Sequence, residues 1–497
     1  MSLEKQIEDA ILAEAKKLIE RHQSYQNTLH HEHIRLCKKI TNPPKKIIKT
    51  PDYWEIDKKF DPFYVRRKSK SIAKSIYKKI RNKTYSPCKP HIKEIDKNGG
   101  GKRKLTIYQI PDAAVSHLFY TRLLSKNKHR FSSFSYAYRS DRNVHFAIQD
   151  ISIDIQQDAR TFIAEFDFSD FFGSINHPSL YEQFSKNGFF ISEEETSVIK
   201  AFLGPSGKGI PQGTSISLFL ANLVCWKLDS QLEKQGLKFA RYADDTVIWS
   251  PDYSSICRAS NIINVFAAEA GVSINIKKSD GINLLADPGS KVEMASKESF
   301  DFLGYSISTD KVSIKNKSEQ KIKKQISHIL YMNLIEPIES KPLRGLIIPS
   351  NNKDPAFLTS ILRIRRYLYG GLLNKKIIEY IQGRSNAIFF KGAMSFYPLL
   401  SNEEQLRNLD GWLLSVIYRA LKRRQELLLA HGFNVSNSFP FNVERDDLPL
   451  ECRKKLISKK PLLEIPSFML IYRALKKGLN DYGIERVMNP KSLSYDY

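Results

Sequence analysis

The pattern of apolar and polar residues predicts a chain in which strands and helices alternate up to about residue 310. Apolar residues recur with a helical period over residues 3–21, where Ser2 can cap the first turn. A short basic helix is predicted over residues 68–83, and two strands joined by a Gly-rich turn over residues 91–111. Residues 112–160 are mostly helical, with a break at "RSDRN".

The middle of the chain carries strand signals that end in carboxylates. "TFIAEFDFSDFF" (161–172) is strand-like up to Asp167, and a helix follows. "PQGTSISLFLANLVCWKLDSQLEK" predicts a long apolar helix, and the hairpin after it contains Asp244 and Asp245.

Beyond about residue 310 the pattern changes to helices rich in Lys and Arg. The longest of them follows a predicted capping box of Ser401 and Glu404 and ends at Gly432. A helical C-terminal region is therefore expected after the mixed part of the chain.

Charge changes this picture, because its sign reverses along the chain. Residues 1–150 carry +18 (33 basic and 15 acidic side chains), residues 151–310 carry −8 (13 and 21), and residues 311–497 carry +15 (32 and 17). Two basic flanks favour a polyanionic partner such as nucleic acid. The acidic middle favours a cluster of metal-binding carboxylates.

Length, composition and cysteine content limit the classes of protein that this chain can belong to. A chain of 497 residues with 41% hydrophobic residues is long enough for two to four folded domains. No run of about 18 apolar residues occurs, and the N-terminus is charged, so neither a membrane span nor a signal peptide is expected. The five cysteines form no C-x-x-C pair, which favours reduced thiols and a cytoplasmic location.

Adjacent carboxylates in a hairpin are the strongest chemical signal. Asp244 and Asp245 could be a solvated turn, since Asp is common there, or they could flank a cation. Together with Asp167 at an earlier strand end, they suggest three carboxylates on one sheet.

Seven motifs, in one order over roughly residues 90–305, make the chain resemble a reverse transcriptase. "FDFSDFFGSINH" (166–177), "GIPQGTSIS" (209–217) and "YADD" (242–245) resemble the three palm motifs. The hairpin "GGGKRKLTIYQIPD", "SYAYRSDRN", "VSINIKKS" and "FLGY" resemble the other four.

The resemblance implies a metal site. Asp167 and Asp244 would bind two Mg²⁺ ions, replaceable by Mn²⁺, with Asp245 in support and the backbone carbonyl of Phe168 as a further ligand. Asp167, Asp244 and Asp245 would then be the catalytic residues.

It also implies a dNTP site and nucleic-acid contacts. In the dNTP site, Phe172 would be the steric gate against a ribose 2′-OH, and Lys278 a candidate proton donor to pyrophosphate. Arg103 would touch the triphosphate, with Lys97 or Lys102 as helpers. The dNTP set is Arg103, Asp170, Phe171, Phe172, Gln212, Gly213 and Lys278, and the nucleic-acid set is Arg139, Arg142, Leu303 and Gly304.

The fold implied is α+β, a right-hand polymerase with fingers, a palm with an antiparallel sheet and a thumb, followed by an α-helical region. The predicted segments are an N-terminal extension (1–60), fingers (61–160), palm (161–310), a thumb-like region (311–400) and a C-terminal helical domain (401–497).

The activity implied is RNA-directed DNA synthesis from dNTPs. A viral-type RNA polymerase would carry Asp where this chain has Phe172. No HNH endonuclease, RNase H constellation or retron-type N-A-x-x-H is identified, which leaves stand-alone bacterial reverse transcriptases of antiphage defence.

Several alternatives stay open: a group II intron or retron-type enzyme in a mobile element, and a non-catalytic RNA-binding protein. The expected partners are an RNA template (a co-encoded non-coding RNA), the DNA product and dNTPs; a homo-oligomer is left open. Protein priming from Tyr495, Tyr497 or Ser494 is a further hypothesis.

Overall fold

The structure, a computed structural model, describes every residue except 38–42, 97–101, 159, 288, 340–353, 386–387, 455, 458–459, 462 and 494–497. The chain forms two compact units. Unit 1 consists of Met1–Asn27 and Ile48–Lys297, and unit 2 of Thr28–Ile47 with Glu298 and the described residues that follow it. The five predicted segments are finer than this division and stay predictions.

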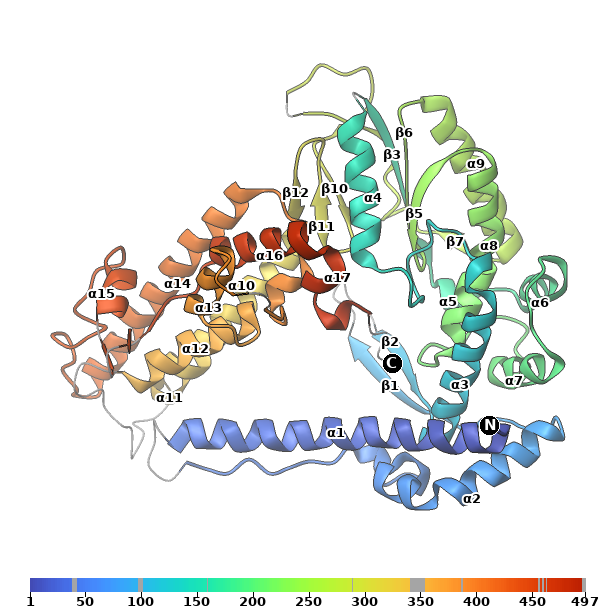
Figure 1. Cartoon of the computed structure of the whole chain (residues 1–497), viewed down its shortest axis with the longest axis horizontal. Helices are drawn as coiled ribbons and strands as arrows, with labels where there is room; N and C mark the ends of the chain where they lie inside the picture. Colours follow the sequence, from blue (N-terminus) through green and yellow to red (C-terminus); the bar gives the residue numbers. More distant parts are fainter. Residues whose placement is uncertain are drawn as a thin grey trace. The chain divides into compact units, whose positions relative to one another are not determined.

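Unit 1 holds the mixed part of the chain (Figure 1). Its elements are the first part of α1 (Leu3–Cys37), η1 (Asp52–Trp54), η2 (Lys58–Phe60), α2 (Pro62–Arg81), β1 (His91–Asp96), β2 (Lys102–Ile107), α3 (Ile110–Asn127), η3 (Lys128–Arg130), α4 (Val144–Gln157), β3 (Thr161–Phe166), β4 (Phe168–Ser169), α5 (Phe171–Ser174), α6 (His177–Lys186), α7 (Glu193–Leu203), α8 (Ile216–Lys234), β5 (Lys238–Tyr242), β6 (Asp245–Ser250), α9 (Tyr253–Ala270), β7 (Ser273–Ile274), β8 (Gly281–Leu285) and β9 (Ser296–Lys297).

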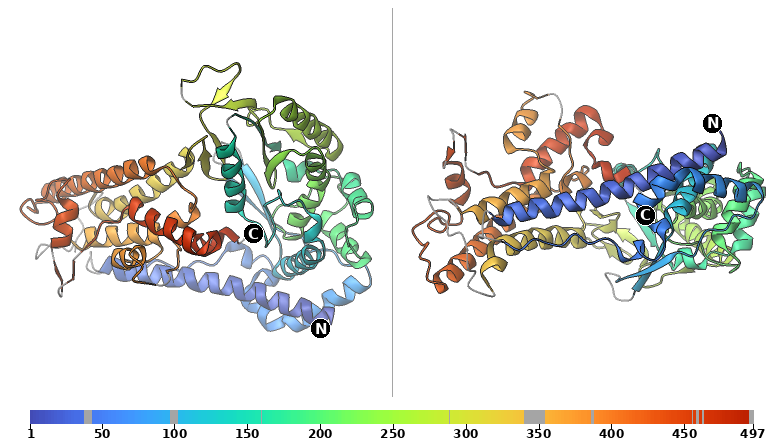
Figure 2. Two further views of the ribbon diagram at one scale, coloured as in Figure 1. Left: turned by 45° about the horizontal axis from the view of Figure 1, so that its top comes forward. Right: turned by 90° about the horizontal axis from the view of Figure 1, so that it is seen from below.

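A five-stranded sheet with strand order β5-β6-β3-β8-β9 forms the centre of unit 1. The pairs are antiparallel except for β8 with β9. β3 is the middle strand, and nearly all of its side chains are buried, which is why "TFIAEF" contains few polar residues. Figures 1 and 2 show α8 and α9 on one face of the sheet and α4 on the other.

α8 is the core helix of this unit. All its residues from Ile216 to Cys225 are buried, so the helix is apolar around its whole circumference at this end. Two smaller pairings accompany the sheet: the hairpin β1–β2 and the short pair β4–β7.

Unit 2 begins with a three-stranded antiparallel meander and continues in helices. Its elements are β10 (Phe300–Phe302), β11 (Tyr305–Ile307), β12 (Val312–Ile314), α10 (Asn316–Leu330), the π-helical turn η4 (Tyr331–Ile335), α11 (Glu336–Glu339), α12 (Pro355–Tyr369), α13 (Asn374–Ile381), η5 (Ala393–Phe396), α14 (Glu403–Ala430), α15 (Leu448–Lys454), β13 (Leu456–Ile457), β14 (Lys460–Pro461), α16 (Phe468–Tyr482), α17 (Ile484–Val487) and η6 (Pro490–Leu493).

A buried ion pair organises unit 2. Arg424 of α14 donates to both carboxylate oxygens of Asp354, at 2.6 and 3.2 Å, and to the carbonyl of Leu334 at 2.9 Å. Asp354 is also the N-cap of α12, since it accepts from the backbone N–H of Ala356. One carboxylate therefore both starts α12 and ties it to α14.

Several sequence-based boundaries need correction. α1 continues to Cys37 because its polar second half remains helical beyond the predicted stop. α2 begins earlier than predicted, where Asp61 caps the helix. The predicted capping box is wrong: Asn402 caps α14, while the Ser401 hydroxyl instead accepts from the backbone N–H of Val312.

None of the described helices is both long and apolar enough to cross a membrane. None of the five cysteines forms a disulfide bond.

Candidate active site

Asp167 and Asp245 lie opposite each other at the end of two neighbouring strands. β3 and β6 are antiparallel and pair Phe166 with Thr246, so the residue after β3 faces the residue that opens β6. Asp244 occupies the two-residue turn between β5 and β6. The chain thus brings two motifs that are far apart in sequence to one sheet edge.

A buried arginine holds this turn. Arg241 donates to the carbonyl of Ala243 at 3.0 Å, and Ala243 has the left-handed backbone of a tight hairpin turn (φ 60°). The same guanidinium makes two 2.6 Å hydrogen bonds to Asp229, and both side chains are only 1% exposed. It also donates to Ser135 and Asn222.

The carboxylates of the site repel one another. The surrounding protein atoms, followed by the charges of Asp244 and Asp167, raise the pKa of Asp245 to about 7, although Asp245 itself remains exposed to solvent. A positive charge placed here would relieve this repulsion.

Asp167 is held by the segment after β7. Asn275 donates from its backbone N–H to the Asp167 carbonyl and from its side-chain amide to the Asp167 carboxylate, both at 2.8 Å. Lys278 forms an ion pair with the same carboxylate at 3.0 Å, although its side chain is 67% exposed. This hydrogen bond raises the pKa of Lys278.

The donor set fits a hard divalent cation. Among the described residues, no three His, Cys, Asp or Glu side chains already surround one metal position. The fit rests on chemistry: Asp167, Asp244 and Asp245 offer anionic oxygen ligands without His or Cys, as Mg²⁺ prefers.

The loop at Gly213 makes a close approach to the β1–β2 hairpin. Gly213 has a φ of +104°, and a Cβ at this position would lie 2.2 Å from the carbonyl oxygen of Thr106 in β2. Only glycine fits here. Gln212 is half-buried beside it.

The predicted steric-gate segment is joined to this loop. The carbonyl of Phe172 accepts from the backbone N–H of Ile210 at 2.6 Å. Phe172 is half-buried and contacts Phe171, which is part of the core, edge to face. Asp170 is exposed and has a left-handed backbone (φ 44°).

The basic residues predicted to contact the triphosphate from the β1–β2 hairpin differ in their surroundings. Arg103 lies on β2 opposite Ile95, but its side chain is not among the parts that the structure describes. Lys97 lies outside the described residues. Lys102 forms an ion pair with Glu94 at 2.8 Å.

Arg139 has a structural role in this structure. Its guanidinium is buried, donates to the carbonyl of Ser132 at 2.5 Å and forms a two-pronged contact with Asp141. These bonds tie the loop before α4 together and occupy the donors that a phosphate would need. Arg142 is half-buried and retains its predicted role as a hypothesis.

The remaining predicted residues lie outside unit 1 or outside the described chain. Leu303 and Gly304 form the turn between β10 and β11 in unit 2, both with positive φ. Ser494, Tyr495 and Tyr497 lie outside the described residues.

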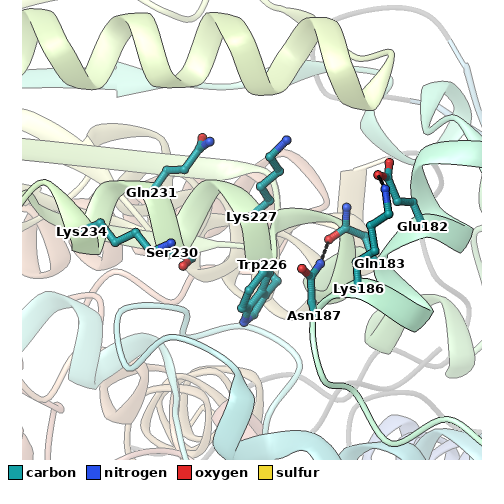
Figure 3. A pocket seen from close by; sticks show the side chains of 9 residues that line it. All are labelled: Glu182, Gln183, Lys186, Asn187, Trp226, Lys227, Ser230, Gln231 and Lys234. Carbon is teal, nitrogen blue, oxygen red and sulfur yellow. Dashed lines mark hydrogen bonds and ion pairs between the residues drawn. The ribbon is translucent and has the colours of Figure 1, made fainter.

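A polar pocket of about 310 Å³ lies between α6 and α8 (Figure 3). In Figure 3, Lys227 and Gln231 extend from one side of α8 and Trp226 from the other. None of the predicted site residues lines it. Lys186 pairs with Glu182, and Lys227 pairs with Glu269 at 2.7 Å, so two of the three lysines that line the pocket have a carboxylate partner.

Arg241, Asp229 and Asn275 were not predicted. Asn275 lies in "VSINIKKS", three residues before Lys278, so the same motif contained it. Hydropathy patterns predict arginine at exposed positions, so the sequence did not predict the buried Arg241–Asp229 pair.

Comparisons with known proteins agree with this geometry. The family model "Reverse transcriptase (RNA-dependent DNA polymerase)" matches residues 95–307. The retron Ec86 reverse transcriptase of Escherichia coli is 26% identical over 274 residues, which cover 51% of this chain and 78% of that protein.

Solved structures give weaker likenesses. A truncated apo telomerase from Candida tropicalis has a TM-score of 0.33 at 15% identity, over 48% of this chain and 59% of its own. Telomerase from the same organism with a fragment of telomeric RNA has a TM-score of 0.36 at 12% identity, over 81% of this chain and 75% of its own. With TM-scores below 0.5, these likenesses do not bear on the fold or the function of this chain.

The family match and the carboxylate-bearing antiparallel sheet confirm the α+β right-hand polymerase fold predicted from the sequence. Residues 95–307 are therefore a reverse transcriptase domain, that is, an RNA-dependent DNA polymerase.

Proposed function

We propose that this protein copies an RNA template into DNA by nucleotidyl transfer at Asp167, Asp244 and Asp245. The observation that carries the proposal is the meeting of these carboxylates at one sheet edge, where the surrounding protein and the acidic neighbours raise the pKa of Asp245 to about 7. Such crowding is favourable only when cations share the site.

Two Mg²⁺ ions, replaceable by Mn²⁺, would be held by Asp167 and Asp244, with Asp245 and the Phe168 carbonyl in support. When bound, they activate the primer 3′-OH and neutralise the leaving pyrophosphate. Asn275 orients the Asp167 carboxylate. The Lys278 ammonium would give a proton to the departing pyrophosphate, and its raised pKa keeps it protonated for that role.

The incoming dNTP would lie beside the point where the β1–β2 hairpin and the Gly213 loop meet. The close approach of Gly213 to Thr106 supports this placement, because it joins the two predicted dNTP-binding segments. Gln212, Asp170 and Phe171 would complete the pocket, and Arg103 would reach the triphosphate. Leu303 and Gly304 would steady the primer and Arg142 the template.

Phe172 would select deoxynucleotides. Primer extension on an RNA template, with dNTPs or NTPs supplied separately, tests this choice. Wild type should use dNTPs, and Phe172→Ala should gain NTP incorporation. Extension by wild type from NTPs alone would instead mean an RNA polymerase.

The biological role proposed is antiphage defence in the bacterial cytoplasm, with a co-encoded non-coding RNA as template. A retron-type enzyme is a second candidate, favoured by the similarity to the Escherichia coli retron protein. Sequencing the RNA and DNA that co-purify with the protein separates them. A branched RNA–DNA product would favour the retron type.

Protein priming from Tyr495, Tyr497 or Ser494 is proposed as the origin of the DNA strand. Intact-mass analysis after incubation with dNTPs tests it. A nucleotide adduct on the C-terminal peptide is expected, and an unmodified peptide beside active synthesis would end this part of the proposal.

A further inference from the structure

Unit 2 contains an arginine-lined pocket that none of the roles above uses. Its volume is about 340 Å³. The lining residues are Arg35, Thr359, Leu362, Arg363, Arg365, Arg366 and Gly371. Arg35 lies in the last turn of α1, and the others lie on α12 or just after it, all within unit 2.

α12 has two distinct faces. Phe357, Ile361, Ile364 and Leu368 are fully buried and pack into the core. Thr359, Leu362, Arg363 and Arg366 recur at helical spacing on the other face, and Leu362 is 45% exposed. The arginines therefore lie outside the face that packs α12 into the core.

The pocket holds more positive charge than its surroundings balance. Among ion pairs of the described residues, only Arg363 with Glu32, at 3.8 Å, involves these four arginines. Burial and then the nearby charge of Arg35 lower the pKa of Arg363, and burial lowers the pKa of Arg365. Like charges gathered in a half-buried hollow are unfavourable until an anion joins them.

The pocket between α6 and α8 gives the contrast. There Lys186 and Lys227 each have a carboxylate partner. The arginine pocket has less compensation, since its four arginines have only the 3.8 Å contact of Arg363 with Glu32 and the nearby charge of Glu464 at Arg365. The planar guanidinium group also suits phosphate oxygens, because it can donate two parallel hydrogen bonds.

We propose that the arginine pocket binds backbone phosphates of the RNA strand, as an anchor separate from the catalytic carboxylates. Its volume suits about one nucleotide, and Leu362 and Thr359 offer an apolar surface and a hydroxyl to the sugar or base. The proposal rests on the proposed function, because it takes the template to be RNA.

Fluorescence anisotropy with a labelled single-stranded oligouridylate tests the anchor in the full-length protein. The variant carries Arg35→Gln, Arg363→Gln and Arg366→Gln, and Arg407→Gln is the control, an exposed arginine of α14 paired with Glu403. Affinity at 0.1 M salt should fall about fivefold for each arginine, and the salt slope by about 2. Arg407→Gln should leave both nearly unchanged.

A second measurement separates binding from folding. If the arginines only repel one another, replacing them should leave the melting temperature of the variant equal to or higher than that of wild type. If they have a structural role, replacing them should lower it. Unchanged RNA affinity and salt slope in the triple variant would overturn the proposal. So would loss of inorganic phosphate or pyrophosphate binding with intact RNA binding, since the pocket would then serve small phosphates.

Failure of the proposed function would look different. Wild type would then bind the oligouridylate with the arginine dependence described but would extend no primer with dNTPs. Primer extension by wild type together with unaltered RNA binding by the triple variant would refute the anchor alone.

Discussion

The buried pair of Arg241 and Asp229 should be essential both for the stability of unit 1 and for the shape of the turn that carries Asp244. The perturbation is Asp229→Asn, which keeps the size of the side chain and removes its charge. Arg241 then remains buried with its positive charge uncompensated, while its bond to the Ala243 carbonyl can shift. The next residue along the chain is the catalytic candidate Asp244.

The expected loss follows from the contacts. Two 2.6 Å charge-assisted bonds join side chains that are each 1% exposed, so water cannot replace the lost partner. Removing one member of a buried ion pair costs about 3–5 kcal/mol. An exposed pair should cost less than about 1 kcal/mol, and the control is Arg258→Met, which loses a 3.9 Å contact with Asp252 and exposed hydrogen bonds to the Ser254 and Ser255 hydroxyls.

Urea unfolding followed by tryptophan fluorescence measures the loss, because buried Trp249 lies on β6 of the same sheet. Polymerase activity is measured in parallel below the transition. A loss of under 1 kcal/mol for Asp229→Asn would refute the reasoning.

A double variant separates stability from positioning. Arg241→Met with Asp229→Leu replaces the pair by apolar side chains and should restore much of the stability. Activity should stay low, since the Ala243 carbonyl has lost its anchor. Full activity in this variant would mean that the turn keeps its shape without Arg241.

Three further predictions concern single residues. Asn275→Ala should lower activity about 10- to 100-fold and raise the Mg²⁺ concentration needed, because it frees the Asp167 carboxylate; an unchanged Mg²⁺ titration would contradict this. Gly213→Ala should raise the KM for dNTPs and destabilise unit 1 more than Gly207→Ala, which also has a positive φ (+73°) but open space around it; equal effects would refute the close approach. Burial lowers the pKa of His145 to about 4, so the unfolded state binds a proton at His145 before the folded state does, and the free energy of unfolding falls as the pH drops from 6.5 to 4. Between pH 7 and 5, the free energy of unfolding of His145→Gln should therefore fall by about 2 kcal/mol less than that of wild type. Equal losses in urea titrations at the two pH values would contradict this.

The sequence predicted the sheet edge that carries the three carboxylates, because each signal for it is local. Runs of strand-forming residues marked β3 and the β5–β6 hairpin, and the carboxylates stand at their ends. Long apolar runs such as α8 were equally clear, since a helix buried on all sides needs no amphipathic pattern.

Long-range polar contacts were not predictable in this way. Arg139 looks like a nucleic-acid contact in sequence, yet Asp141 and the Ser132 carbonyl engage its guanidinium. Ser401 resembles a helix cap but serves β12 instead. Whether a polar side chain contacts solvent, substrate or a distant backbone group depends on the folded chain, and the local sequence pattern does not predict it.

The most direct test of the central claim is RNA-templated primer extension with dNTPs by wild type, Asp167→Asn and Asp244→Asn. The control is Asp310→Asn, an exposed carboxylate of unit 2. The account predicts synthesis by wild type and the control, and a loss of at least about a thousandfold in the two site variants at unchanged stability. Synthesis at wild-type rates by Asp244→Asn would contradict it.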